Sequence, residues 1–67
     1  MKLWIARNKD GSLALFSYKP WKIRYDTFDK LRGDFIELDK KLYPEVTFDN
    51  SPIEVELVIK KQDENRD

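Results

Sequence analysis

Basic and aromatic residues are interleaved near the middle of the chain, and their types and spacing could support nucleic-acid binding. The candidate contacts follow Tyr18 and are Lys19, Trp21, Lys22, Arg24 and Tyr25. Single-stranded nucleic acid is bound in this way, because rings stack on bases and cations neutralise phosphates. A second interpretation stays open: in a strand, Trp21 and Tyr25 point to the same side as Ile23 and would join the core. The zero net charge and the pI near 6.2 favour the core, since dedicated nucleic-acid binders carry a basic excess.

Catalytic residues are scarce. The chain has no histidine and no cysteine, so the commonest general base and the thiolate nucleophile are missing. Ser12, Ser17 and Ser51 have no base near them in the sequence, and two glycines are too few for a phosphate-binding loop. We therefore expect a non-catalytic protein that uses no cofactor.

Carboxylates are the remaining candidates for metal ligands. Asp26 with Asp29, or Asp34 with Asp39, could hold a hard cation through oxygen atoms. Helix capping and turn formation explain the same residues without a metal. The N-K-D-G stretch at residues 8–11 resembles part of a calcium loop, but Ala6 and Arg7 precede it where acidic residues are needed. No metal site is predicted.

Size and composition limit the chain to one domain of 67 residues with a small margin of stability. The apolar runs reach about four residues, far short of a membrane span, and Lys2 is followed at once by strand-like residues, so we expect a cytoplasmic protein. Residues 1–32 hold eight basic and three acidic residues, whereas residues 33–67 hold five basic and ten acidic ones. This segregation indicates either a basic binding face or, the favoured interpretation, two halves that attract each other across a sheet.

Residues 2–7 and 12–18 are two strand-like runs joined by N-K-D-G, which predicts a hairpin whose Gly11 takes a positive φ. If Asn8 opposes Ser12, the register pairs Trp4 with Phe16 across the hairpin. Both faces are then apolar. Such a hairpin must be covered on both sides, by other elements or by a second subunit.

The middle of the chain changes character several times. Residues 21–25 alternate as a third strand, and residues 26–33 fit either a short helix ending at Gly33 or a long irregular hairpin loop. Residues 35–39 are strand-like. Pro44 bars a central strand, so residues 40–44 are expected to be a loop or one helical turn with Leu42 and Tyr43 directed inward. A short extended piece over 46–48 and a turn at D-N-S-P follow.

The run P-I-E-V-E-L-V-I-K, residues 52–60, is predicted to be the central strand. Its apolar residues Ile53, Val55, Leu57 and Ile59 alternate with polar ones, apart from Val58. Truncation of Leu57 to alanine would then cost roughly 2–5 kcal/mol. Residues 1–60 are expected to form the single domain, and residues 61–67, which contain no apolar residue, to form a mobile tail.

These elements predict a mainly β domain, β or α+β. The expected core is a small antiparallel sheet of about five strands, curled or barrel-like, with at most one short helix. For function, the apolar hairpin and nine aromatic residues favour a protein-interaction or self-association module, with a homodimer as the simplest form. The alternative is weak single-stranded nucleic-acid binding through residues 18–25.

The two ends of the folded part resemble a group of short uncharacterised bacterial proteins, some of prophage type. The motifs that carry this resemblance are M-K-L-W-I-A-R-N-K-D-G-S-L, F-I-E-L-D and P-E-V-T-F-D-N-S-P-I-E-V-E-L. The resemblance implies a compact accessory protein without an assigned activity. It also implies that N-K-D-G and D-N-S-P are structural turns, and it transfers no functional residue.

Overall fold

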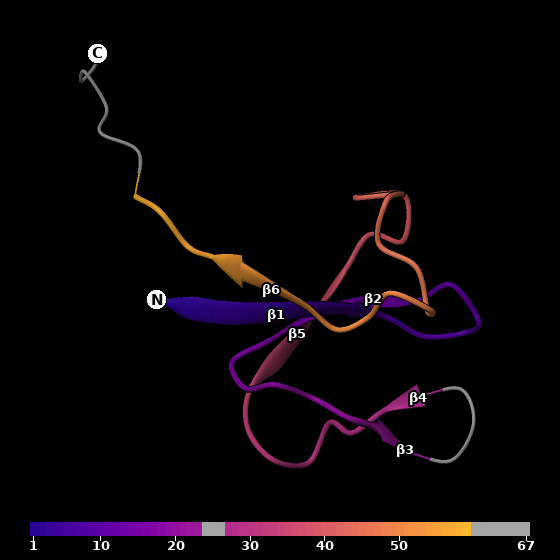
Figure 1. Cartoon of the computed structure of the whole chain (residues 1–67), viewed down its shortest axis with the longest axis horizontal. Coiled ribbons are helices and arrows are strands. Elements are labelled where there is room, and N and C mark those ends of the chain that lie inside the picture. Colours follow the sequence, from indigo (N-terminus) through magenta and orange to yellow (C-terminus); the bar gives the residue numbers. More distant parts are fainter. Residues whose placement is uncertain (24–26, 60–67) are drawn as a thin grey trace.

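The computed structural model describes residues 1–23 and 27–59, and over these residues the protein is all-β. The strands are β1 (Lys2–Arg7), β2 (Leu13–Phe16), β3 (Lys22–Ile23), β4 (Thr27–Phe28), β5 (Phe35–Leu38) and β6 (Ile53–Glu56). An antiparallel sheet has the order β5-β2-β1-β6, and β3 pairs with β4 in a separate two-stranded ribbon (Figure 1). The predicted fold class is confirmed. The sheet has four strands, however, and it does not close into a barrel.

The β1–β2 hairpin has the predicted register. Trp4 opposes Phe16, and Arg7 opposes Leu13. The turn closes because Asn8 N–H donates to Ser12 O over 2.8 Å and Gly11 N–H donates to Asn8 O over 3.0 Å. Gly11 has a φ of 98°, a conformation that glycine adopts without a steric penalty. The local sequence therefore accounts for this hairpin.

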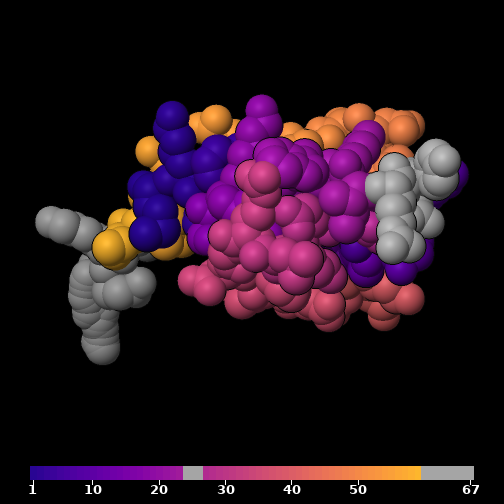
Figure 2. Space-filling view, turned by 90° about the horizontal axis from the view of Figure 1, so that it is seen from below, coloured from indigo at the N-terminus to yellow at the C-terminus, as the bar shows by residue number. Residues whose placement is uncertain are grey.

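The first face of the hairpin is covered by the β3–β4 ribbon. Ala6, Ala14 and Phe16 form a buried cluster with Phe28 of β4, and the ring of Phe48 packs edge-on against Phe28. Tyr18 ties the ribbon to the hairpin, because its hydroxyl donates a 2.6 Å hydrogen bond to Asp29 O. Figure 2, seen from the ribbon side, shows the segment around β3 and β4 spread over the hairpin.

The second face is covered by the loop between β5 and β6, residues 39–52. Val46 of this loop is buried against Ile5 and Leu13, and Leu15, Leu38, Ile53 and Val55 pack around them. In Figure 1 this loop lies on the opposite side of the hairpin from the β3–β4 ribbon. The prediction that both apolar faces need cover is thus confirmed: the ribbon covers the first face together with Phe48 of the loop, and the rest of the loop covers part of the second face.

The predicted position of residues 52–60 is wrong. β6 lies at an edge of the sheet, and the central strands are β1 and β2. Ile53 and Val55 are half-buried, but the side chain of Leu57 is 58% exposed, so Leu57 is not a core residue. Alternation identified the strand correctly, but it does not specify how many neighbouring strands pair with it. Residue 60 and the predicted tail, 61–67, lie outside the described residues.

The middle segment also differs from several predictions. Trp21 is 49% exposed and Leu31 is 92% exposed, and residues 27–33 form β4 and bends instead of a helix. Residues 46–48 form no strand, and Leu42 and Tyr43, expected to point inward, are about half exposed. Strand β5 is confirmed. So is the D-N-S-P turn, in which Asn50 Oδ1 accepts from Thr47 N–H over 2.7 Å.

Candidate interaction surface

The guanidinium of Arg7 holds the 39–52 loop in place. It donates hydrogen bonds to one carbonyl oxygen of the hairpin turn and to four of the loop. These belong to Gly11 (2.7 Å), Lys40 (3.0 Å), Leu42 (2.9 Å), Tyr43 (3.0 Å) and Val46. The Arg7 backbone N–H donates to Ser51 Oγ over 2.9 Å. Arginine suits this role because its planar group presents five donors in a fixed arrangement.

The role of Arg7 was not predicted from the sequence. Arg7 follows Leu3 and Ile5 on the same face of β1, so it stands at an inward position of an apolar alternation. A charged residue at such a position is a signal that partners must be supplied by another segment. The partners here are backbone carbonyls, which have no signature in the sequence.

A groove of about 460 Å³ lies beside the loop on the second face. Its lining is mostly apolar and comes from the four strands of the main sheet, from the 39–52 loop and from the residue after β6. The apolar lining residues are Leu3, Ile5, Leu15, Leu38, Leu42, Tyr43, Val46, Ile53, Val55 and Leu57. Leu42 is 45% exposed and Tyr43 is 50% exposed. The loop covers only part of this face, and the apolar surface next to it stays accessible.

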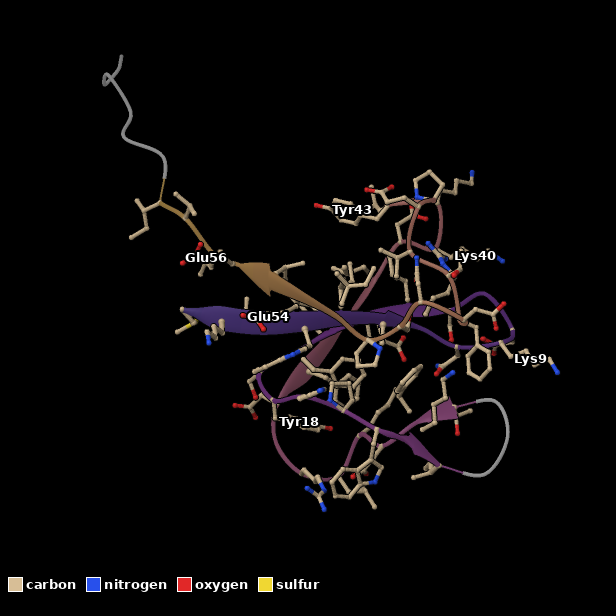
Figure 3. The ribbon with its side chains drawn as sticks, in the orientation of Figure 1. Lys9, Tyr18, Lys40, Tyr43, Glu54 and Glu56 are labelled. Atoms are coloured by element: carbon tan, nitrogen blue, oxygen red, sulfur yellow. The ribbon has the colours of Figure 1, made fainter. Side chains whose placement is uncertain are left out.

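Two acidic residues border the groove, Glu45 of the loop and Glu56 at the end of β6. Glu56 opposes Lys2, which lies on the same side of β1 as Trp4, so the Glu56 side chain is directed toward the first face. Figure 3 shows Tyr43 on the loop and Glu56 at the end of β6. The groove therefore offers an apolar floor with one acidic residue, Glu45, on its loop side. This arrangement suits a partner with apolar side chains beside a lysine or arginine.

The predicted nucleic-acid contacts are only partly brought together. Lys19, Trp21 and Lys22 are exposed, whereas Arg24 and Tyr25 lie outside the described residues. The Arg32 guanidinium stacks 3.2 Å from the Trp21 ring centroid, and Lys22 Nζ lies 4.2 Å from that of Phe48. Trp21 is therefore a surface residue. Its ring already has a cation stacked on it, and Lys22 already contacts an aromatic ring.

Two of the aspartates considered as metal ligands, Asp29 and Asp39, have other contacts for their carboxylates. Asp29 is buried; its Oδ1 accepts from Leu31 N–H over 2.9 Å, and its Oδ2 lies 3.2 Å from Arg32 Nε. Asp39 Oδ1 accepts from Lys41 N–H over 2.9 Å. Asp26 lies outside the described residues. Among residues 1–23 and 27–59, no three acidic, histidine or cysteine side chains gather where they could hold a metal ion.

Among residues 1–23 and 27–59, two side chains have shifted pKa values, and both belong to structural contacts. Hydrogen bonds from the Ser12 backbone N–H and hydroxyl lower the pKa of Asp10 in the hairpin turn. Burial raises the pKa of the Tyr18 phenol, because the phenolate would lose solvation. Neither group lines the groove.

The sheet, the ribbon and the groove define an all-β module, and the comparisons do not place it in a family. No family model, curated protein or solved structure matches this chain. No described helix is long and apolar enough to cross a membrane. Function is therefore argued from the geometry alone.

Proposed function

We propose that the chain is a small non-catalytic accessory protein that binds another protein through the groove on its second face. The observation that carries this proposal is the accessible apolar lining beside the Arg7-held loop. Burial of such surface is the main favourable term in protein association. A cytoplasmic location remains part of the proposal and rests on the sequence.

A protein segment suits the groove better than a small polar ligand. Small-molecule sites combine an apolar lining with several convergent polar groups that orient the ligand. Within the described residues, the charged residues that border this groove are Glu45 and Glu56, and the Glu56 side chain is directed toward the other face of the sheet. An apolar peptide segment with a basic residue beside it would contact the lining and Glu45.

Site-specific photo-crosslinking in the native cell tests the groove. A benzophenone side chain is placed at Leu42, which lines the groove, or at Leu31, which is 92% exposed and does not line it. We expect a discrete protein adduct from position 42 and none from position 31. Equal adducts from both positions, or none from either, would reject the groove as a binding surface. Reversing the charge on the loop side of the groove, by Glu45→Lys, should weaken the adduct.

Exposure of Trp21 supports a second candidate, weak binding of single-stranded nucleic acid. A half-exposed indole beside Lys22 and Arg32 has the chemistry of a base-stacking site. Oligonucleotide titrations of a Trp4→Phe variant would follow the fluorescence of Trp21 alone. Quenching that weakens steeply with salt would support this candidate, and an unchanged signal at low salt would remove it.

A further inference from the structure

Residues 57–59 form an apolar run that projects past the end of the sheet. Leu57, Val58 and Ile59 are 58%, 71% and 88% exposed. The alternation that begins at Ile53 continues to Ile59, yet β6 ends at Glu56. The last bond to the neighbouring strand is Leu57 N–H to Met1 O, 3.1 Å. The alternating pattern of β6 therefore continues beyond its last bond to β1.

The outer edge of this segment also carries free backbone groups. Val55 opposes Leu3, and Leu57 N–H bonds to Met1, so the groups of these residues face β1. In an antiparallel ladder successive residues face opposite neighbours, which turns the N–H and C=O groups of Glu54, Glu56 and Val58 outward. Among the described residues these groups have no hydrogen-bond partner. Such an edge is a template for another strand.

We propose that a second copy of this chain pairs antiparallel with this edge, with the two-fold axis at Leu57. Leu57 then opposes Leu57 of the second copy, and Val55 opposes Ile59 of the second copy. Glu56 and Val58 of the two copies exchange backbone hydrogen bonds, which uses the outward groups. Each exposed apolar residue of the run gains a neighbour on the partner strand.

Charge disfavours the two registers whose axis lies nearer to Glu54. A two-fold axis at Val55 would place Glu54 opposite Glu56 of the second copy, and an axis at Glu56 would place Glu56 opposite itself. Like charges directly opposite each other destabilise a sheet. With the axis at Leu57, each Glu56 stands opposite the apolar Val58, and the two Glu56 side chains are diagonal instead of opposite.

The pairing joins the two main sheets into one sheet of eight strands. Leu57 and Val55 also line the groove, so the two grooves meet along the new ladder. The inference therefore deepens the proposed function by naming one partner, the chain itself. It uses the edge of β6 and leaves the loop side of the groove open for another protein.

Cysteine scanning tests the register, because the natural chain contains no cysteine. Under mild oxidation Leu57→Cys should form a disulfide-linked dimer, since directly opposed residues lie within disulfide reach. Glu56→Cys and Val58→Cys are the matched controls, because each thiol is then diagonal to its own copy. We expect the disulfide at position 57 to form at least about tenfold faster than the disulfides at positions 56 and 58, because diagonal residues lie farther apart than a disulfide allows. Equal rates at the three positions, or no linkage at position 57, would overturn the proposal.

Sedimentation over a range of concentrations tests the ladder. Val58→Pro removes an N–H that makes no bond within one chain, and it keeps Leu57 extended. The dimer should dissociate at least about tenfold more readily, as expected for two lost hydrogen bonds. Val58→Thr, which keeps the N–H, should associate like the natural chain. Unchanged association of Val58→Pro, or a natural chain that stays monomeric up to about 1 mM, would overturn the dimer. Neither outcome affects the crosslink at position 42, so the two proposals fail separately.

Discussion

The two faces of the β1–β2 hairpin are covered by different kinds of contact. On the first face, aromatic rings of the β3–β4 segment and of Phe48 pack against small buried side chains. On the second face, one buried valine is held in place by a loop whose backbone is bonded to Arg7. Packing of rings closes the first face, whereas hydrogen bonding holds the second cover above a partly open apolar surface. The comparison suggests that the polar anchor is what allows a groove to persist in so small a protein.

Truncation of Phe28 should have the largest effect on stability. Phe28 is 2% exposed at the centre of the first face, and Phe28→Ala should cost roughly 3–5 kcal/mol. Urea denaturation followed by circular dichroism measures this loss, with the exposed Leu31→Ala as control. A loss below about 1 kcal/mol would show that ring packing does not hold the first face.

Loss of the Arg7 guanidinium should come next. Arg7→Ala leaves several loop carbonyls without their donor and should cost about 2–3 kcal/mol, less than the sum of the bonds because exposed carbonyls regain water. Relative to the natural chain, hydrogen exchange in this variant should speed up more in residues 40–51 than in β1 and β2. Arg7→Lys keeps the charge but not the planar donors, and it should recover less than half of the loss. Full recovery would mean that charge alone holds the loop.

The hairpin turn, which both faces share, should be less sensitive. A Cβ at Gly11 meets no atom within 4 Å, so the cost of Gly11→Ala comes from its φ of 98° and should be about 1–2 kcal/mol. Thermal melting measures the change, and Asp10→Ala in the same turn is the matched variant. An unchanged melting temperature would contradict the positive φ.

Alkaline pH should weaken the first face in particular. Burial raises the pKa of Tyr18 above its ordinary value of 10.0, so the folded state binds this proton more tightly than the unfolded state. The stabilising contribution is present below pH 10 and is lost as the pH rises through the higher folded pKa. Tyr18→Phe should cost about 1 kcal/mol at neutral pH and should show a weaker decline above pH 10. An identical decline in both proteins would exclude Tyr18 as its cause.

The smallest effect is expected for Leu57. Because its side chain is 58% exposed, Leu57→Ala should cost under about 1 kcal/mol in the monomer. The sequence pattern alone predicts roughly 2–5 kcal/mol for a central strand. Denaturation at low protein concentration distinguishes these two expected losses. Ile5→Ala, which truncates a buried residue of β1, shows the loss expected for a core position.

Local patterns predicted the hairpin well, because turn chemistry and alternation act over a few residues. The same alternation placed residues 52–60 at the centre of the sheet, since it reports a buried side but not the number of paired edges. A core position was the favoured interpretation for Trp21, because in a strand Trp21 points to the same side as Ile23; its exposed ring instead stacks with Arg32, which no spacing rule connects to it. The groove depends on Arg7 contacting carbonyls 33 to 39 residues away, and backbone acceptors are identical at every position. Residue types alone therefore do not predict long-range polar contacts of this kind.

The anchoring of the loop through its backbone has a consequence for how the protein can vary. Arg7 contacts the carbonyls of Lys40, Leu42 and Tyr43 and not their side chains. Substitution at these positions therefore leaves the anchor intact, with Tyr43 best replaced by glycine or asparagine because its φ is 50°. Natural drift or deliberate randomisation can thus change the side chains that border the groove while one arginine preserves the shape of the loop.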